Sequence, residues 1–287
     1  MPPQREHAIC LRHAEWSETS QVVTLLTQHT GLVRGLAKGA TRPRAPYSGG
    51  FETLTRGEIV YFPKREGLST LAAWDVTDTA RAFRNDLTAQ RLGLYAVDLA
   101  AHLILDHDPH PRSYAALAAL LEQLRTNTAI EPRLRALATF HTAILHEIGL
   151  LPDWGEITTE LDDTARPPRV YLFTPQTGRL TPQPERSRGD TAEPGWAVRA
   201  STVVLLRELA AAIGELDRGR PRSATPPPTK TGDAEATAVA ARAVALLDAW
   251  CAVSIGKKVP TSGVLEASLS QAGWRPTRDE VPRAASR

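Results

Sequence analysis

Residues 31–50 read GLVRGLAKGATRPRAPYSGG and contain four basic side chains with no acidic residue between them. These four are Arg34, Lys38, Arg42 and Arg44. Guanidinium and ammonium groups make charge-assisted hydrogen bonds to phosphate oxygens, so this stretch offers anion-binding chemistry. The glycines at 35, 39, 49 and 50 would let the backbone approach a ligand closely. We interpret the stretch as a ligand-binding surface, and the alternative is an ordinary solvated loop after a strand.

Aromatic side chains around this stretch could stack on the bases of a single-stranded nucleic acid. The candidates are Trp16, Tyr47, Phe51, Tyr61 and Phe62. Most of them would also suit the core of a small barrel, and we expect only Tyr47 to be exposed. Lys64 and Arg65 come shortly after the last of these aromatics and complete the set of candidate contact residues.

The other residues that could hold a metal lack the spacing of known sites. Asp106, His107, Asp108 and His110 lie within the stretch LDHDPHP. Zinc and calcium sites need ligand spacings that this run does not reproduce, so we interpret it as a polar helix end running into a proline turn. His141 and His146 are five residues apart on an expected helix and point in different directions, so we expect them to be solvated or at the core edge.

Nothing in the sequence indicates an enzyme. Cys10 lies between Ile9 and Leu11 in an expected strand, where a cysteine is usually a buried apolar residue. A phosphate-binding GxxxxGK[ST], a GxGxxG after a strand and a GxSxG elbow are all missing. A nuclease would need clustered carboxylates for a metal, and the first 67 residues offer only isolated ones such as Glu18, Glu52 and Glu58.

Composition limits the class of protein further. The chain has 287 residues, a net charge of +2 and two cysteines, Cys10 and Cys251. It is therefore not a polycation that coats nucleic acid indiscriminately, and it has too few cysteines for a disulfide framework. We find no apolar run near the ~20 residues that span a bilayer and no secretion signal, so we expect an intracellular protein.

The first 77 residues favour short strands separated by Gly, Pro, Ser or Thr. The expected strands cover residues 8–14, 20–28, 32–38, 57–64 and 68–76. Five strands in so short a segment predict a small barrel. Residues 28–31 would form a tight turn that makes the second and third strands antiparallel neighbours.

From Thr79 the apolar residues follow helical spacing. Prolines 109 and 111 separate the first expected helix from the second, and Pro132 suits the first turn of the third. Residues 151–194 are irregular apart from a strand-like VYLF at 170–173, and a helix is expected from Trp196 to Leu216. A flexible linker of about 217–234, a last helix and a frayed tail over 271–287 complete the chain.

The stretch from AICLRHAEWSETSQVVTLL to LTRGEIVYF resembles the N-terminal domain of the RecO family of DNA repair and recombination mediators. FHTAILHEIGLLPD at 140–153 and the segment 243–265 are similar to later parts of that family. The resemblance implies an α+β protein with an N-terminal OB-fold, a five-stranded β-barrel, over residues 1–78. A helical domain would follow over 79–150 and 195–270.

The resemblance also implies what the protein does. Members of this family bind single- and double-stranded DNA, anneal complementary strands and, with RecR, help RecA replace single-strand-binding protein. The family's basic AKGxRR-like segment falls on residues 37–42. The implied DNA-binding residues are Arg34, Lys38, Arg42, Arg44, Tyr47, Lys64 and Arg65. The implied partners are DNA, RecR, the C-terminal tail of single-strand-binding protein and, indirectly, the RecA filament, in a cytoplasmic, nucleoid-associated setting.

One departure from the family concerns metal. Many relatives carry two CxxC pairs after the GLLPD-type helix end, whereas this chain has no cysteine between residues 151 and 194. We therefore expect no zinc and no other cofactor. A non-enzymatic adaptor that keeps the fold but has lost DNA binding remains the alternative. Residues 31–67 hold seven Lys or Arg against three Asp or Glu, which favours DNA binding.

Overall fold

The structure is a computed structural model that describes residues 2–64, 66–155, 170–182, 195–217 and 233–275. Its contacts divide the chain into two compact units. Unit 1 comprises Met1–Ala129 and Val259–Ser268, and unit 2 comprises Ile130–Lys258 and Leu269–Arg287. Two helices that follow the barrel therefore group with it by contacts, although the change from strands to helices falls near residue 79, as the sequence indicates.

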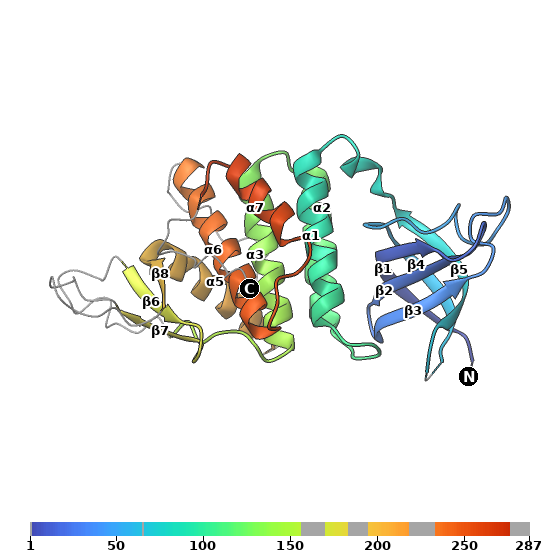
Figure 1. Cartoon of the computed structure of the whole chain (residues 1–287), viewed down its shortest axis with the longest axis horizontal. Helices are drawn as coiled ribbons and strands as arrows, with labels where there is room; N and C mark the ends of the chain where they lie inside the picture. The colour runs from blue at the N-terminus through green and yellow to red at the C-terminus, as the bar shows by residue number, and fades with distance from the viewer. Residues whose placement is uncertain (1, 65, 156–169, 183–194, 218–232, 276–287) are drawn as a thin grey trace. The chain divides into compact units, whose positions relative to one another are not determined.

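Five strands near the N-terminus close into a barrel, which confirms the predicted fold class (Figure 1). They are β1 (Gln4–Glu15), β2 (Gln21–Thr27), β3 (Gly31–Ala37), β4 (Arg56–Phe62) and β5 (Ser69–Asp78). The order around the barrel is β1-β2-β3-β5-β4, and β3 and β5 are the parallel pair. Antiparallel β2 and β3 are joined by the predicted turn, where Thr27 pairs with Gly31.

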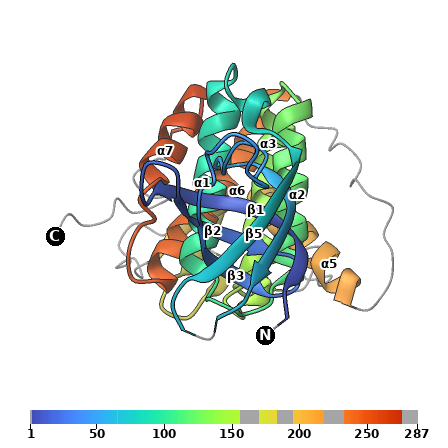
Figure 2. The same ribbon diagram turned by 90° about the vertical axis from the view of Figure 1, so that its right-hand side faces the viewer.

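The barrel is filled by side chains from alternate strand positions, as the pleat requires. Val23 and Leu25 of β2, Val33 and Ala37 of β3, and Trp74 of β5 all lie in this core. The segment between β3 and β4 adds Tyr47 and Phe51, whose rings lie 5.8 Å apart. The Phe51 ring stacks on Trp74 at 5.2 Å. Figure 2 looks onto the barrel and shows its strands crossing in front of the helices.

Two helices of unit 1 pack on one side of the barrel. They are α1 (Leu87–Leu103) and α2 (Pro111–Thr126), preceded by the 3-10 turn η1 (Ala80–Phe83). The Asp86 side chain accepts a hydrogen bond from Ala89 N at 2.9 Å and begins α1, and Pro111 stands in the first turn of α2. Helix α1 contacts β1 and β2, and α2 contacts β2.

Unit 2 is built around three helices, α3 (Ile130–Glu147), α5 (Ala200–Asp217) and α6 (Asp233–Ser254). Helix α7 (Ser262–Gln271) begins within unit 1 and ends in unit 2. Residues 234–254 of α6 are long and apolar enough to cross a membrane by length and composition. Half of that apolar window is buried, and α6 packs against α3 and α5, so we assign it to the core of unit 2.

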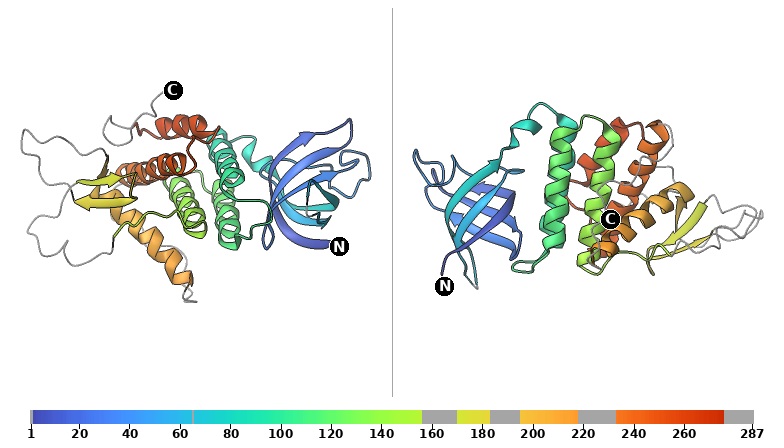
Figure 3. Two further views of the ribbon diagram at one scale, coloured as in Figure 1. Left: turned by 60° about the horizontal axis from the view of Figure 1, so that its bottom comes forward. Right: turned by 180° about the vertical axis from the view of Figure 1, so that it is seen from behind.

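A three-stranded sheet in unit 2 corrects one prediction. The strands are β6 (Val170–Thr174), β7 (Arg179–Pro182) and β8 (Trp196–Arg199), and Figure 3 shows them side by side in both views. The helix predicted from Trp196 therefore begins only at Ala200, because residues 196–199 pair with β6. The predicted irregular segment 151–194 holds β6 and β7 between two stretches, 156–169 and 183–194, that lie outside the described residues, as does most of the predicted linker.

Candidate nucleic-acid interface

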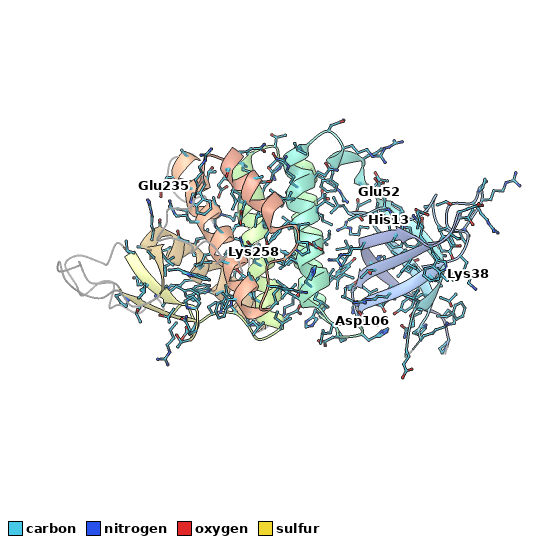
Figure 4. The ribbon with its side chains drawn as sticks, in the orientation of Figure 1. His13, Lys38, Glu52, Asp106, Glu235 and Lys258 are labelled. Atoms are coloured by element: carbon cyan, nitrogen blue, oxygen red, sulfur yellow. The ribbon has the colours of Figure 1, made fainter. Side chains whose placement is uncertain are left out.

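Strand β3 separates apolar from basic side chains by simple alternation. Val33 and Ala37 point into the barrel and are fully buried. Arg34 points outward, and Lys38, four positions further on, is exposed on the same side. Figure 4 labels Lys38 on the barrel. The prediction that Arg34 and Lys38 share a face agrees with this alternation.

Only one end of the outer face of β2 and β3 is covered. Leu26 and Leu32 pair across the two strands and are fully buried, because α1 and α2 pack against β2 there. One step along, Thr24 pairs with Arg34, and the Arg34 side chain is 56% exposed. The uncovered end of this face therefore begins at Arg34.

Arg34 has an acidic partner, which a ligand would have to replace. Its Nε lies 3.1 Å from Oδ1 of Asp106, in the segment between α1 and α2 (Figure 4). Both side chains are about half exposed, and such pairs contribute ~0–1 kcal/mol. A phosphate can therefore compete for this guanidinium at small cost.

The loop after β3 holds its basic residues out in solvent. Thr41 N donates to Thr19 O at 3.2 Å, and Gly39 N donates to Ser20 Oγ at 3.1 Å, so the loop begins against the β1–β2 turn. Arg42 and Arg44 are exposed, and Arg44 has a φ of 64°, in the left-handed region that non-glycine residues seldom adopt. The loop is fixed at both ends while its guanidinium groups remain accessible.

Lys64 is exposed at the start of the β4–β5 connection. Its backbone N donates to Ser69 Oγ at 3.3 Å, and Ser69 pairs with Gly35 of β3. This connection therefore returns beside the strand that carries Arg34. Arg65, the other basic residue predicted here, lies outside the described residues.

The expectation that Tyr47 is exposed was wrong. Tyr47 is 4% exposed, and its hydroxyl donates to Leu71 O at 2.7 Å inside the barrel. Burial raises the pKa of its phenol above the ordinary value. Phe51 and Tyr61 are buried as well, whereas Trp16 is 66% exposed and Phe62 43% exposed. The loop turns back so that Tyr47 fills the barrel, which cannot be read from local sequence.

The remaining candidate groups are structural in the described part of the chain. Cys10 is fully buried, as predicted, and burial raises the pKa of its thiol far above the usual range. His141 is fully buried rather than solvated or at the core edge, which corrects the prediction, and burial lowers its pKa to about 4. Among the described residues, no group of three or more His, Cys, Asp or Glu could hold a metal.

The LDHDPHP stretch connects the helices to the barrel. Residue 106 bridges to Leu32, and His107 N donates to Leu32 O at 3.0 Å. His110 Nε2 lies 3.0 Å from Asp108 Oδ2 at the start of α2. The interpretation of this run as a polar helix end leading into a turn agrees with these contacts.

Two polar junctions that position the barrel were missed by sequence reasoning. Asp98 of α1 accepts a hydrogen bond from Arg12 of β1, and its other oxygen accepts one from Thr261 Oγ1 at 2.8 Å. Asp78 bonds both Arg56, at 2.6 Å, and Arg125, at 3.2 Å. The partners lie far apart in sequence, so no local pattern could have indicated them.

Comparison with known proteins identifies the family. Residues 1–80 match the family model described as "Recombination protein O N terminal", and residues 84–156 match the one described as "Recombination protein O C terminal". Together these matches extend over most of the first 156 residues. The chain belongs to the recombination protein O family.

Similar proteins carry the name DNA repair protein RecO. One from Anaeromyxobacter sp. (strain K) is 36% identical over 149 residues, which are 50% of this chain and 56% of that protein. Another from Geobacter metallireducens is 37% identical over 126 residues, or 43% of this chain and 50% of that protein. The chain thus spans about half the length of the curated relatives it matches. The family models stop at residue 156, so the resemblance seen at 243–265 stays a prediction.

Proposed function

We propose that this chain is a DNA-binding recombination mediator that acts in DNA repair. The observation that supports it most is the exposure of four basic residues on β3 and the loop after it, in a chain of this family. They are Arg34, Lys38, Arg42 and Arg44, and Lys64 and Arg65 extend the surface. Five-stranded OB barrels bind nucleic acids with the face of strands 2 and 3 and the adjoining loops. The uncovered basic side chains occupy that face here.

The proposed chemistry is neutralisation of phosphates without covalent steps. Each Lys or Arg that contacts a phosphate releases condensed counterions, so affinity should fall steeply with salt. The weak Arg34–Asp106 pair leaves Arg34 available for this exchange. We propose no catalytic residue and no cofactor.

The finer proposal concerns strand annealing and partners. A protein that neutralises the phosphates of two complementary strands at once lowers the repulsion between them. We propose that it anneals such strands and, with RecR, assists the loading of RecA onto DNA coated by single-strand-binding protein. Such work would take place in the cytoplasm, at the nucleoid.

A hollow in unit 2 supports capture of an acidic, apolar peptide tail from the single-strand-binding protein. It has an empty volume of about 240 Å³ and is lined by Ala197, Val198, Arg199, Thr202, Arg242, Leu246 and Trp274. Two arginines together with Leu246 and Trp274 provide both kinds of contact that such a tail needs. We had expected the walls of this site to come from the helices between 79 and 150, and the hollow is a second candidate location.

The first test is a salt titration of binding to single-stranded and duplex DNA. Replacing Arg34, Lys38, Arg42 and Arg44 by Gln should weaken both and flatten the plot of log affinity against log salt by up to about one unit per lost contact. The matched control replaces four basic residues elsewhere in unit 1, Arg5, Arg81, Arg84 and Arg112, and removes the same charge.

The outcome separates the proposal from its alternative. Equal slopes for the two four-fold variants would mean that net charge, and not this surface, governs binding. A wild-type chain that binds neither DNA form at low salt would support the adaptor that has kept the fold but lost DNA binding.

A further inference from the structure

Trp16 is a large apolar side chain left in solvent. It is 66% exposed, whereas Trp74, Trp154, Trp196 and Trp274 are all at most 8% exposed. Burying a side chain of this size stabilises a fold substantially, so a tryptophan is usually buried where the fold allows it. Single exposed apolar residues are nevertheless common and need no explanation by themselves. What matters for Trp16 is its position.

The strand register places Trp16 beside the basic surface. The last paired row across three strands is Glu15, Gln21 and Ala37. One step further, Trp16 N donates to Ser20 O at 2.8 Å, and Ser20 Oγ accepts from Gly39 N at 3.1 Å. Trp16, Ser20 and Lys38 therefore form the next row. At ~4.8 Å between strands, Trp16 and Lys38 are separated by roughly 10 Å.

Alternation also places Trp16 on the outer side of the barrel. Arg12 pairs with Thr24, and Thr24 pairs with the outward Arg34. Trp16 is four positions after Arg12 and shares its side of the strand. Glu15 has the opposite direction, and its carboxylate accepts a hydrogen bond from Gln21 Nε2 at 3.0 Å.

We propose that Trp16 stacks on an unpaired base of a DNA strand whose phosphates are held by Lys38, Arg34 and Arg42. This inference rests on the proposed function and adds a substrate preference to it. A base in a duplex already stacks on its neighbours and is paired, so its face is not available to Trp16. The basic residues bind both forms of DNA, and Trp16 favours the single strand.

One nearby charge sets the path of the strand. Glu18 is exposed in the β1–β2 turn, two residues after Trp16, and would repel a phosphate. The strand therefore passes on the Lys38 side of the indole. Glu18→Gln should strengthen binding of both DNA forms slightly without changing their ratio.

The test compares affinities for an oligo-dT strand and for a duplex of equal length at one salt concentration. Trp16→Ala should weaken oligo-dT binding about 5- to 100-fold, the range for loss of one stacked base, and change duplex binding by less than about twofold. Trp16→Phe should keep most of the single-strand affinity. The control is Phe62→Ala, which removes a 43% exposed aromatic on β4, two strands from β3.

Each outcome has a distinct meaning. If the wild-type chain binds neither DNA form, the proposed function itself fails. If the wild type binds but Trp16→Ala keeps its ratio of single-strand to duplex affinity, the stacking role is overturned and phosphate binding stands. Equal effects of Trp16→Ala and Phe62→Ala would also overturn it. Because Trp16 is exposed, thermal unfolding of Trp16→Ala should match that of the wild type.

Discussion

Tyr47 shows how a residue chosen for binding can serve the fold. Its hydroxyl donates to Leu71 O at 2.7 Å within the barrel, and its ring lies beside Phe51. The aromatic positions could be listed from sequence, but their burial depends on how the loop after β3 returns to the barrel. The two aromatics left exposed, Trp16 and Phe62, lie at the ends of strands.

Replacing Tyr47 by Phe should lower stability without affecting DNA binding. The substitution removes one buried hydrogen bond and leaves the Leu71 carbonyl unsatisfied, which costs about 1–3 kcal/mol. Chemical denaturation measures the loss, and a salt titration of DNA affinity measures the second half of the prediction. A large loss of DNA affinity in a folded Tyr47→Phe variant would restore Tyr47 as a contact residue.

At the level of elements, local pattern predicted what local pattern determines. The five strands and the helices α1, α2 and α3 were predicted because their apolar residues repeat at the strand or helix period and prolines or glycines separate them. Residues 196–199 were assigned to a helix because no breaker separates Arg199 from Ala200. Their strand conformation comes from pairing with β6, including Trp196 with Phe173. Pairing between distant segments is not visible in local periodicity.

The turn between β2 and β3 offers a test of how the hairpin meets the helices. Gly31 has a φ of 83°, and a Cβ built there would lie 2.0 Å from the backbone oxygen of Asp108. Gly67 has a similar φ of 75° but nothing within 4 Å of a Cβ. Gly31→Ala should therefore destabilise the chain by at least about 2 kcal/mol more than Gly67→Ala, because only Gly31 adds a clash with backbone to the strained φ.

Thermal or urea unfolding of the two glycine variants gives this difference directly. Both substitutions place alanine at a positive φ, so the comparison cancels that cost. Equal destabilisation would mean that the α1–α2 segment moves away from the hairpin without loss.

At the level of the whole molecule, unit 2 has an aromatic core close to the position where many relatives are expected to carry zinc. Phe173 is fully buried, and its ring lies 5.5 Å from Trp154, 5.5 Å from Trp196 and 5.4 Å from Trp250. These rings connect β6 and β8 to α6 and to the end of the segment after α3. Packing of this kind can hold a small sheet without a metal ion.

We therefore predict that stability here depends on Phe173 and not on zinc. Phe173→Ala should cost about 3–5 kcal/mol, and a chelator should leave the unfolding of the wild-type chain unchanged. Elemental analysis of the purified chain should find no stoichiometric zinc. One tightly held zinc per chain would show that His and Asp ligands had been underrated.

The last prediction concerns annealing, the activity that combines both units. If the basic surface of unit 1 neutralises two strands at once, complementary oligonucleotides should anneal without any nucleotide cofactor, and the rate should fall as salt screens the surface. The variant with Arg34, Lys38, Arg42 and Arg44 replaced by Gln should lose this activity on naked strands. Coated strands add a second requirement, because the coating protein must be engaged before its DNA is reached.

Intact and tail-deleted single-strand-binding protein separate these two requirements. The wild-type chain should anneal strands coated with the intact protein and fail on strands coated with the tail-deleted form. Leu246→Asp, which puts a negative charge into the hollow of unit 2, should fail on both coated substrates while annealing naked strands normally, if that hollow holds the tail. Normal annealing of coated strands by Leu246→Asp would return the search to the helices between residues 79 and 150. A wild-type chain that anneals neither coated nor naked strands at low salt would remove the mediator proposal and leave the adaptor.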